Sequence, residues 1–195
     1  MSKPNTFHSS AAATGRRAFL RRAGALCGVV GVMGALPGPV RATLATTTQA
    51  RRLRFVHTHT GETLTAEYFD GSAYSPACLG AVQHLLRDFR TGDAHWIDPQ
   101  LLDVLYELQT LADRDSTFEV ICGYRSPATN AMLHRNSSGV AEHSQHLLGK
   151  AIDIRLSGYP TRRLGEYARS LARGGVGFYA ASDFIHVDTG PVRHW

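Results

Sequence analysis

The ten residues Ser144-Gln145-His146-Leu147-Leu148-Gly149-Lys150-Ala151-Ile152-Asp153 place an imidazole and a carboxylate seven positions apart, with small residues between them. A neutral His nitrogen and an Asp oxygen are both zinc ligands, and a catalytic zinc site takes three protein ligands and leaves a fourth position for water. Gly149 and Ala151 suit such a site because small residues let backbone and substrate approach an ion. A third ligand is therefore expected downstream.

The segment Asp183–Asp188, near the C-terminus, supplies a candidate for that ligand. It reads DFIHVD, and its alternation of apolar and polar residues is typical of a half-buried strand. Side chains two positions apart on a strand share a face, so His186 and Asp188 are expected on the same side. His146, Asp153 and His186 are the predicted ligands of one Zn²⁺ ion.

Several separate motifs carry a resemblance to known peptidases. The pattern Ser-x-His-x-x-Gly-x-Ala-x-Asp, followed by a late strand His, resembles the zinc peptidases grouped with lysostaphin, the D-Ala-D-Ala peptidases and the hedgehog signalling domain. A closer likeness, from about Arg54 to Trp195, is to the periplasmic murein endopeptidase K group. It is carried by Gly123–Pro127 (GYRSP), the ten-residue stretch, Gly174–Tyr179 (GGVGFY) and His186–Trp195 (HVDTGPVRHW). The resemblance implies a zinc-dependent endopeptidase that hydrolyses peptide cross-links of peptidoglycan during cell-wall growth or remodelling.

Arg125 stands between a run of β-forming residues, Thr117–Cys122, and a helix that Ser126 caps and Pro127 opens. From the residues alone, an Arg at such a corner is as readily a surface residue as a site residue. The resemblance places it in the active site, because related peptidases hold the substrate carbonyl with an Arg there. A guanidinium also suits a developing oxyanion by its charge and its fork of donors. Arg125 is therefore predicted to stabilise the transition state.

The identity of the general base is ambiguous. Many relatives carry a His or Glu two or three residues before the last ligand, where this chain has Asp183-Phe184-Ile185. Phe184 cannot transfer a proton, whereas Asp183 fits the Glu/Asp-x-x-His pattern of the dipeptidases. We favour Asp188 as the base because it shares the strand face of His186, and an orienting role behind a ligand is its alternative. For Asp183, a solvated or capping role at a turn is the alternative.

A second function of a different class is a non-catalytic, zinc-containing module that binds the cell wall or a partner, as hedgehog-type domains exemplify. Phe184 in place of a His is its support. A closed structural site has four protein ligands. The sequence offers three and no convincing fourth, so the enzyme is favoured.

The distribution of charge argues against a nucleic-acid partner. The 195 residues carry a formal net charge of +5, but positions 1–42 hold six basic residues and no acidic ones. The remainder has 15 basic residues against 16 acidic ones and is close to neutral. Its length suits one domain with one core, and the pattern does not predict an oligomeric state.

Residues 1–42 are typical of a twin-arginine signal peptide. The pair Arg16-Arg17 precedes a Gly- and Ala-rich apolar run, Ala23–Leu36, and a small residue at Ala42 fits cleavage there, with Ala45 as an alternative. The apolar run is shorter than the ~20 residues that a stable membrane span needs. The mature chain is therefore expected in the periplasm.

Export has a consequence for two cysteines, Cys78 and Cys122, because the periplasm is oxidising and permits a disulfide. Two buried thiols that pack as small hydrophobic groups are the equally weighted alternative. The sequence leaves this choice open.

The periodicities predict an α+β domain at 53–195, after a linker at 43–52, with helices packed around a small, mainly antiparallel sheet. By resemblance, this fold is like that of the hedgehog domain and the D-Ala-D-Ala peptidases. The expected strands are Leu53–Thr60, Glu62–Phe69, Thr117–Cys122, Lys150–Leu156, Val176–Tyr179 and Asp183–Asp188. The expected helices surround Val82–Phe89 and Leu101–Leu111, start at Pro127, and run from Thr161 to about Arg173.

Overall fold

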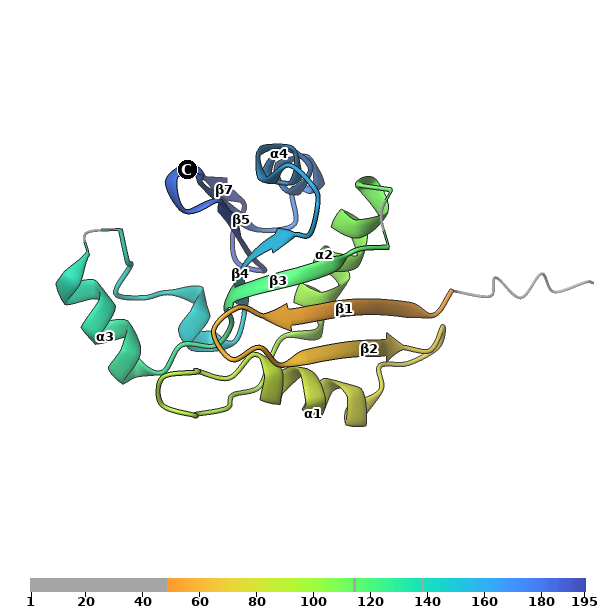
Figure 1. Ribbon diagram of the computed structural model, residues 1–195, viewed down its shortest axis with the longest axis horizontal. Coiled ribbons are helices and arrows are strands. Elements are labelled where there is room, and N and C mark those ends of the chain that lie inside the picture. The colour runs from red at the N-terminus through yellow and green to blue at the C-terminus, as the bar shows by residue number, and fades with distance from the viewer. Residues whose placement is uncertain (1–48, 114, 138) are drawn as a thin grey trace, which may run out of the picture. The chain divides into compact units, whose positions relative to one another are not determined.

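The computed structural model describes residues 49–113, 115–137 and 139–195, so the predicted signal peptide lies outside the described residues. In the unit Ala45–Trp195, the described residues form a sheet, four α-helices and two short 3₁₀ segments (Figure 1). The strands are β1 (Arg51–His57), β2 (Thr63–Phe69), β3 (Thr117–Cys122), β4 (Ala151–Leu156), β5 (Gly175–Tyr179), β6 (Phe184–Asp188) and β7 (Arg193–His194). The helices are α1 (Pro76–Leu85), α2 (Pro99–Leu111), α3 (Pro127–Asn136) and α4 (Thr161–Leu171), with η1 (Gln145–Leu148) and η2 (Ala180–Ser182).

The strands form one seven-stranded sheet in the order β2-β1-β3-β4-β6-β5-β7. Two neighbouring pairs, β1 with β3 and β5 with β7, are parallel, and the others are antiparallel. The predicted α+β class is confirmed, but the sheet is mixed, and the expectation of a small, mainly antiparallel sheet is corrected. The chain crosses through α1 and α2 before β3 joins β1, and a connection of that length permits parallel pairing.

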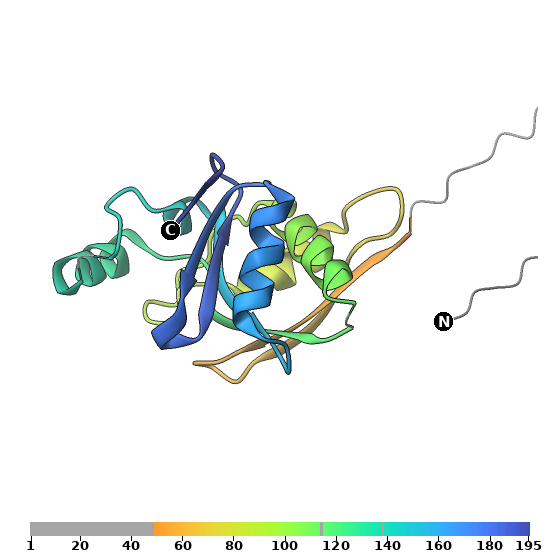
Figure 2. The ribbon, with the colours of Figure 1, turned by 90° about the horizontal axis from the view of Figure 1, so that it is seen from above.

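Helices α2 and α4 lie side by side over one face of the sheet (Figure 2). Helix α1 packs against β2, while α3 lies apart from these helices, beyond the end of β3 (Figures 1 and 2). Among the described residues, no helix combines the length and the apolar character that crossing a bilayer requires. The end of the sheet beside α3 is the part of the unit that carries the predicted site residues.

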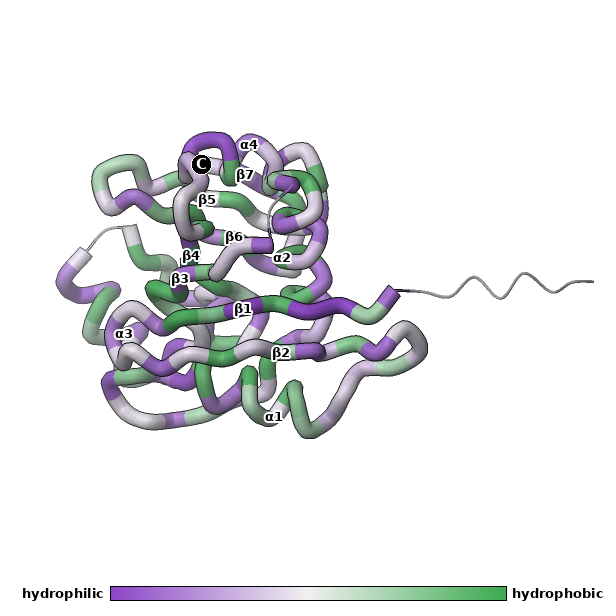
Figure 3. Tube along the Cα trace, turned by 45° about the vertical axis from the view of Figure 1, so that its right-hand side comes forward, coloured by the Kyte–Doolittle hydropathy of each residue, from purple (hydrophilic) through white to green (hydrophobic). Residues whose placement is uncertain are grey.

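The core fills the space between the sheet and the α2–α4 pair. Polar and apolar stretches alternate along β1 (Figure 3), as expected for a strand with one buried face. Burying a side chain such as Phe55 or Leu105 contributes about 1.5–3 kcal/mol. The largest side chains with almost no exposure come from both layers: Leu53, Phe55, Tyr68, Leu86, Leu101, Leu102, Leu105, Leu108, Phe118, Ile152, Ile154 and Leu156.

The predicted helix starts before α2 and α3 are confirmed. The Asp98 carboxylate accepts a hydrogen bond from the Gln100 amide ahead of α2, and the Ser126 hydroxyl accepts one from the Thr129 amide ahead of α3. A proline occupies the first turn of each helix, where its missing N–H costs nothing. Strand β1 starts at Arg51, so the last two residues of the linker predicted at 43–52 belong to the sheet.

Candidate metal centre

The predicted ligands reach one place because β4 and β6 are neighbours. Asp153 and His186 are directly paired in the antiparallel ladder between these strands. His146 comes from η1, which Ser144 caps and which ends at Gly149, in the left-handed region at φ 64°. A Cβ at position 149 would collide with the Trp96 carbonyl, so only glycine permits the turn that leads from His146 into β4.

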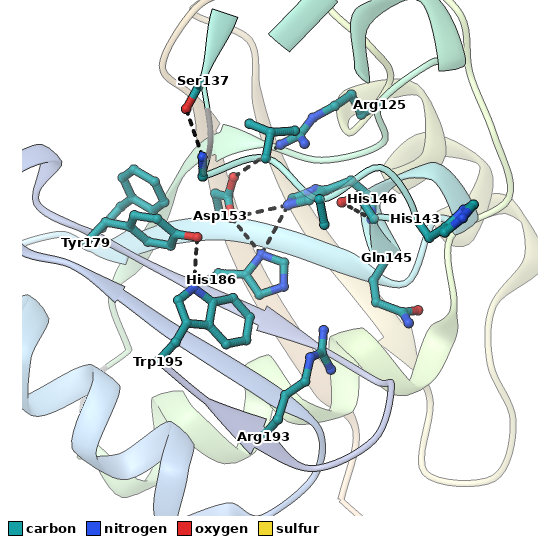
Figure 4. A pocket seen from close by; sticks show the side chains of 15 residues that line it. Arg125, Ser137, His143, Gln145, His146, Asp153, Tyr179, His186, Arg193 and Trp195 are labelled. Carbon is teal, nitrogen blue, oxygen red and sulfur yellow. Dashed lines mark hydrogen bonds and ion pairs between the residues drawn. The ribbon is translucent and has the colours of Figure 1, made fainter. Parts of the chain in front are cut away.

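Three donor atoms of these side chains lie close together. Asp153 Oδ1 is 3.2 Å from His146 Nε2 and 2.9 Å from His186 Nδ1, and the two imidazole nitrogens are 3.1 Å apart. All three side chains are buried, with relative exposures of 2% for His146 and 7% for the other two. Figure 4 shows their polar ends converging beneath a cavity. Bond lengths of ~2.0–2.1 Å in a tetrahedral zinc site would put the ligand atoms ~3.3 Å apart, close to the observed spacing.

The remaining ring nitrogens show which atoms are free to bind a cation. His146 Nδ1 lies 2.7 Å from the Gly123 carbonyl oxygen, which only accepts, so Nδ1 carries the proton and Nε2 keeps a lone pair. In the same way, His186 Nε2 lies 2.9 Å from Asp188 Oδ2, which leaves the lone pair on Nδ1. Two lone pairs and a carboxylate oxygen therefore face one another. This arrangement is repulsive unless a cation or a proton lies between them, and it fits a divalent metal ion.

The pKa shifts agree with that conclusion. Burial raises the pKa of Asp153, but the imidazoles of His146 and His186 outweigh it and hold the pKa well below its usual range. Burial also lowers the pKa of His146, yet the Asp153 carboxylate and the Cys122 sulfur raise it to above the usual value. The site thus favours positive charge at its centre.

Asp188 lies behind His186, on the side of the ring away from Asp153. Its Oδ2 also accepts from Arg193 Nη2 at 2.7 Å, and its Oδ1 accepts from the amides of Gly175 at 3.0 Å and Gly190 at 2.8 Å. Burial raises the pKa of Asp188, but these hydrogen bonds hold it well below its usual range. The carboxylate is therefore ionised and fully occupied as an acceptor.

Asp183, the other candidate base, is not at the metal centre. It has a left-handed backbone at φ 51°, and its Oδ2 lies 3.7 Å from Arg155 Nη1 at the surface. Its side chain is 67% exposed and does not line the cavity above the donors. The structure thus brings together His146, Asp153 and His186, with Asp188 behind them, and keeps Asp183 apart.

Arg125 is buried beside the donors and does not extend into solvent. Its Nη2 is 3.9 Å from Asp153 Oδ2, and its Nη1 donates to Asn130 Oδ1 at 3.2 Å. The Asn130 amide nitrogen in turn donates to the carbonyls of Ala141 and Glu142. Asn130, which the sequence analysis did not single out, therefore ties Arg125 to the loop that edges the cavity.

The cavity has a volume of ≈ 410 Å³ and contrasting walls. One wall is aromatic, since Tyr179 stacks on Phe184 at 4.6 Å and accepts a hydrogen bond from the Trp195 indole (Figure 4). The other wall is formed by residue 137 and residues of the loop at 139–145, and Arg125 and the donors form the floor. A groove of this kind can hold an extended peptide against a metal ion.

Cys122 is a further group that sequence reasoning missed as a site residue. Its sulfur, a His146 ring nitrogen and an Asp153 oxygen all lie within 4.8 Å of one another. Cys122 and Cys78 are both free thiols in the structure, but only Cys122 is buried, so the expectation of two buried thiols holds in part. The signal in the sequence that could have pointed to Cys122 is its position directly before the GYRSP motif. Only the register between β3 and β4 shows that it lies at the metal centre.

Comparisons with known proteins agree with the arrangement. The family model described as peptidoglycan L,D-endopeptidase MepK matches residues 45–195. A probable peptidoglycan L,D-endopeptidase MepK of Haemophilus influenzae is 48% identical over 161 residues, covering 82% of this chain and 86% of the relative. The peptidoglycan L,D-endopeptidase MepK of Escherichia coli K12 is 43% identical over 171 residues, covering 88% and 93%.

A solved structure, the L-Ala D-Glu endopeptidase ChiX of Serratia marcescens, aligns with 40% of this chain and 62% of its own, at 25% identity and a TM-score of 0.32. That overlap is too small to carry an argument. The family model, by contrast, spans every described element that contributes to the metal centre. The chain therefore belongs to the peptidoglycan L,D-endopeptidase MepK family.

Proposed function

We propose that the chain is a zinc-dependent peptidoglycan endopeptidase in which His146, Asp153 and His186 hold one zinc ion. The observation that carries the proposal is the convergence of three acceptor atoms, 2.9–3.2 Å apart, on the floor of a cavity. Membership of the family supports the substrate class, peptide cross-links of peptidoglycan. A zinc ion bound there supplies Lewis acidity, which polarises a scissile carbonyl and lowers the pKa of bound water toward ~7.

Arg125 is the group that we propose to stabilise negative charge on the substrate carbonyl oxygen. It lines the cavity beside Asp153, and its hydrogen bond to Asn130 fixes the plane of the guanidinium. Because the arginine is buried and held in place before substrate arrives, little reorganisation is needed as charge develops.

Asp188 is better suited to positioning than to proton transfer. A general base works best with a pKa near the operating pH and within hydrogen-bond reach of the proton that it removes. Asp188 has a strongly lowered pKa and contacts the far nitrogen of His186. We therefore propose that it holds His186 in the tautomer that presents Nδ1 to the metal, the orienting role named above as its alternative.

The names of the relatives, which are L,D-endopeptidases, support a proposal for the bond that is cut. Of the two common cross-links, that between D-Ala and diaminopimelate joins two D-centres. The link between two diaminopimelates joins an L-centre to a D-centre. We propose the second as the substrate bond. Since peptidoglycan lies outside the cytoplasmic membrane, this also supports a periplasmic location, with export through the twin-arginine signal at 1–42.

The test is hydrolysis of purified muropeptide dimers of each link type. We expect the diaminopimelate-linked dimer to be cleaved, activity to be lost with a chelator, and stoichiometric Zn²⁺ to restore it. His146→Ala should lose both zinc and activity, whereas His84→Ala, at an exposed histidine of α1, should keep both. Cleavage that survives complete removal of metal would refute the proposal. Stable binding of the dimers without cleavage would favour the non-catalytic wall-binding module.

A further inference from the structure

Cys122 reaches the metal centre because the ladder between β3 and β4 is irregular. Val120 is paired with Ile154, and a regular antiparallel ladder would then pair Cys122 with Ile152. The register shifts between these positions, so that Cys122 lies opposite Asp153. A β-bulge inserts an extra residue and re-aims the side chain that follows it. Here it directs a thiol toward a predicted metal ligand.

The surroundings of this sulfur are polar. Its polar neighbours include a His146 ring nitrogen and an Asp153 oxygen, within 4.8 Å, the Arg125 Nη2 atom at 3.8 Å and the Gly123 carbonyl at 3.7 Å. A buried thiol that serves only as a small hydrophobic group packs among apolar side chains, as Cys78 does against the core. Simple packing therefore does not account for the position of Cys122.

The position of the sulfur can be compared with that of a bound metal donor. A tetrahedral zinc site with one bond of ~2.3 Å to sulfur and others of ~2.0–2.1 Å places sulfur ~3.5 Å from its neighbouring ligand atoms. The limit of 4.8 Å in the structure applies to the sulfur, a His146 ring nitrogen and an Asp153 oxygen, so relative to these two ligands a displacement of little more than one ångström gives the zinc-bound spacing. Three ligands leave a zinc site open, whereas four close it.

We propose that Cys122 is a fourth protein donor, whose sulfur occupies the remaining position of the metal centre in the resting protein. The inference rests on the proposed binding of a metal by His146, Asp153 and His186. Its consequence is that the metal centre has four protein ligands in the resting protein, so water and the substrate carbonyl reach the metal only when the sulfur leaves or the coordination number rises. The chain thus carries a self-blocking ligand next to its catalytic machinery.

Cobalt substitution tests the proposal without relying on activity. The full chain, loaded with one equivalent of Co²⁺, should show a near-ultraviolet sulfur-to-cobalt charge-transfer band. Cys122→Ser should abolish the band while one Co²⁺ stays bound. The matched control is the double variant Cys27→Ser/Cys78→Ser, in which Cys122 is the only cysteine left, and it should keep the band. Absence of the band in the wild-type protein, or its persistence in Cys122→Ser, would overturn the proposal.

X-ray absorption of the zinc-loaded wild-type protein gives a second measurement that needs no variant. One sulfur at ~2.3 Å is expected, and a shell of only nitrogen and oxygen would contradict the assignment. Muropeptide hydrolysis, measured on the same samples, separates this inference from the proposed function. A sulfur shell without hydrolysis keeps Cys122 as a ligand and removes the endopeptidase. Hydrolysis without a sulfur shell keeps the endopeptidase and removes Cys122 as a ligand.

Discussion

Replacing Asp188 by Asn distinguishes a positioning carboxylate from a general base. The substitution keeps the shape of the side chain but converts one acceptor oxygen into a donor. Both oxygens of Asp188 face only hydrogen-bond donors. Oδ1 accepts from the amides of Gly175 and Gly190 and from Arg193 Nη1. Oδ2 accepts from the His186 ring and from Arg193 Nη2. The new amide nitrogen therefore opposes a donor in either orientation.

If that nitrogen faces His186, the ring must accept at Nε2, and its proton moves to Nδ1. The lone pair that points toward Asp153 and His146 is then lost. Removal of a partner that orients a metal-binding His weakens metal affinity by ~10–100-fold, which corresponds to about 1.4–2.7 kcal/mol of binding free energy. Competition titration against a chelating dye measures this loss, and circular dichroism checks that the variant is folded.

The matched control is Asp183→Asn, at an exposed carboxylate three residues before His186, which should leave zinc affinity and turnover unchanged. Two results would refute the reasoning. Normal zinc affinity with abolished turnover in Asp188→Asn would make Asp188 the general base. An inactive Asp183→Asn with normal zinc affinity would assign that role to Asp183 and to the Glu/Asp-x-x-His pattern.

Three further predictions concern the oxyanion group, the acid stability and the export signal. Arg125→Ala should keep zinc but lower kcat by ~10²–10³, as loss of one oxyanion contact does. The control Arg155→Ala, on the sheet surface, should leave kcat unchanged. Equal kcat in the wild-type protein and in both variants would remove Arg125 from the mechanism. Burial raises the pKa of Asp88, but hydrogen bonds from Thr129, Ser126 and the Arg90 amide lower it to about 2. Relative to an unfolded value near ~3.9, this contributes about 2–3 kcal/mol to the free energy of unfolding, present above pH ~4 and lost as pH falls toward ~2. Asp88→Asn should remove that acid-dependent part in denaturant titrations, and an unchanged pH slope would contradict it. Replacing both Arg16 and Arg17 by Lys should leave precursor in the cytoplasm, and unchanged export would indicate the general secretory route.

The parts of the fold that depend on local pattern could be predicted from the sequence. Alternation identified β6, helical spacing identified α2 and α4, and Asp98 and Ser126 marked two helix starts. The pairing of β1 with β3 could not be predicted in this way. It joins segments on either side of α1 and α2, and no short-range pattern encodes which strand lies next to which.

In the candidate site too, the features that depend on local pattern could be predicted, and those that depend on side-chain rotation or strand register could not. The spacing of His146 and Asp153 and the alternation around His186 predicted three donors, and the structure brings these donors together. The alternation also put Asp188 on the face of His186. It could not tell which ring nitrogen Asp188 contacts, because that depends on side-chain rotation. Whether Asp188 removes a proton or orients a ligand depends on that contact.

Cys122 shows why strand register matters for the chemistry of this centre. In a regular ladder the residue opposite Asp153 would be Ile121, and the centre would have three donors and an apolar neighbour. The shift between Val120 and Cys122 replaces that neighbour by sulfur without any change in the three predicted ligands. If Cys122 binds the metal as proposed, the difference between an open and a closed metal centre depends on one irregular step in β3. The same strand leads into the segment that holds Arg125, whose Nη2 lies 3.8 Å from the sulfur, so a movement of Cys122 also acts on the arginine.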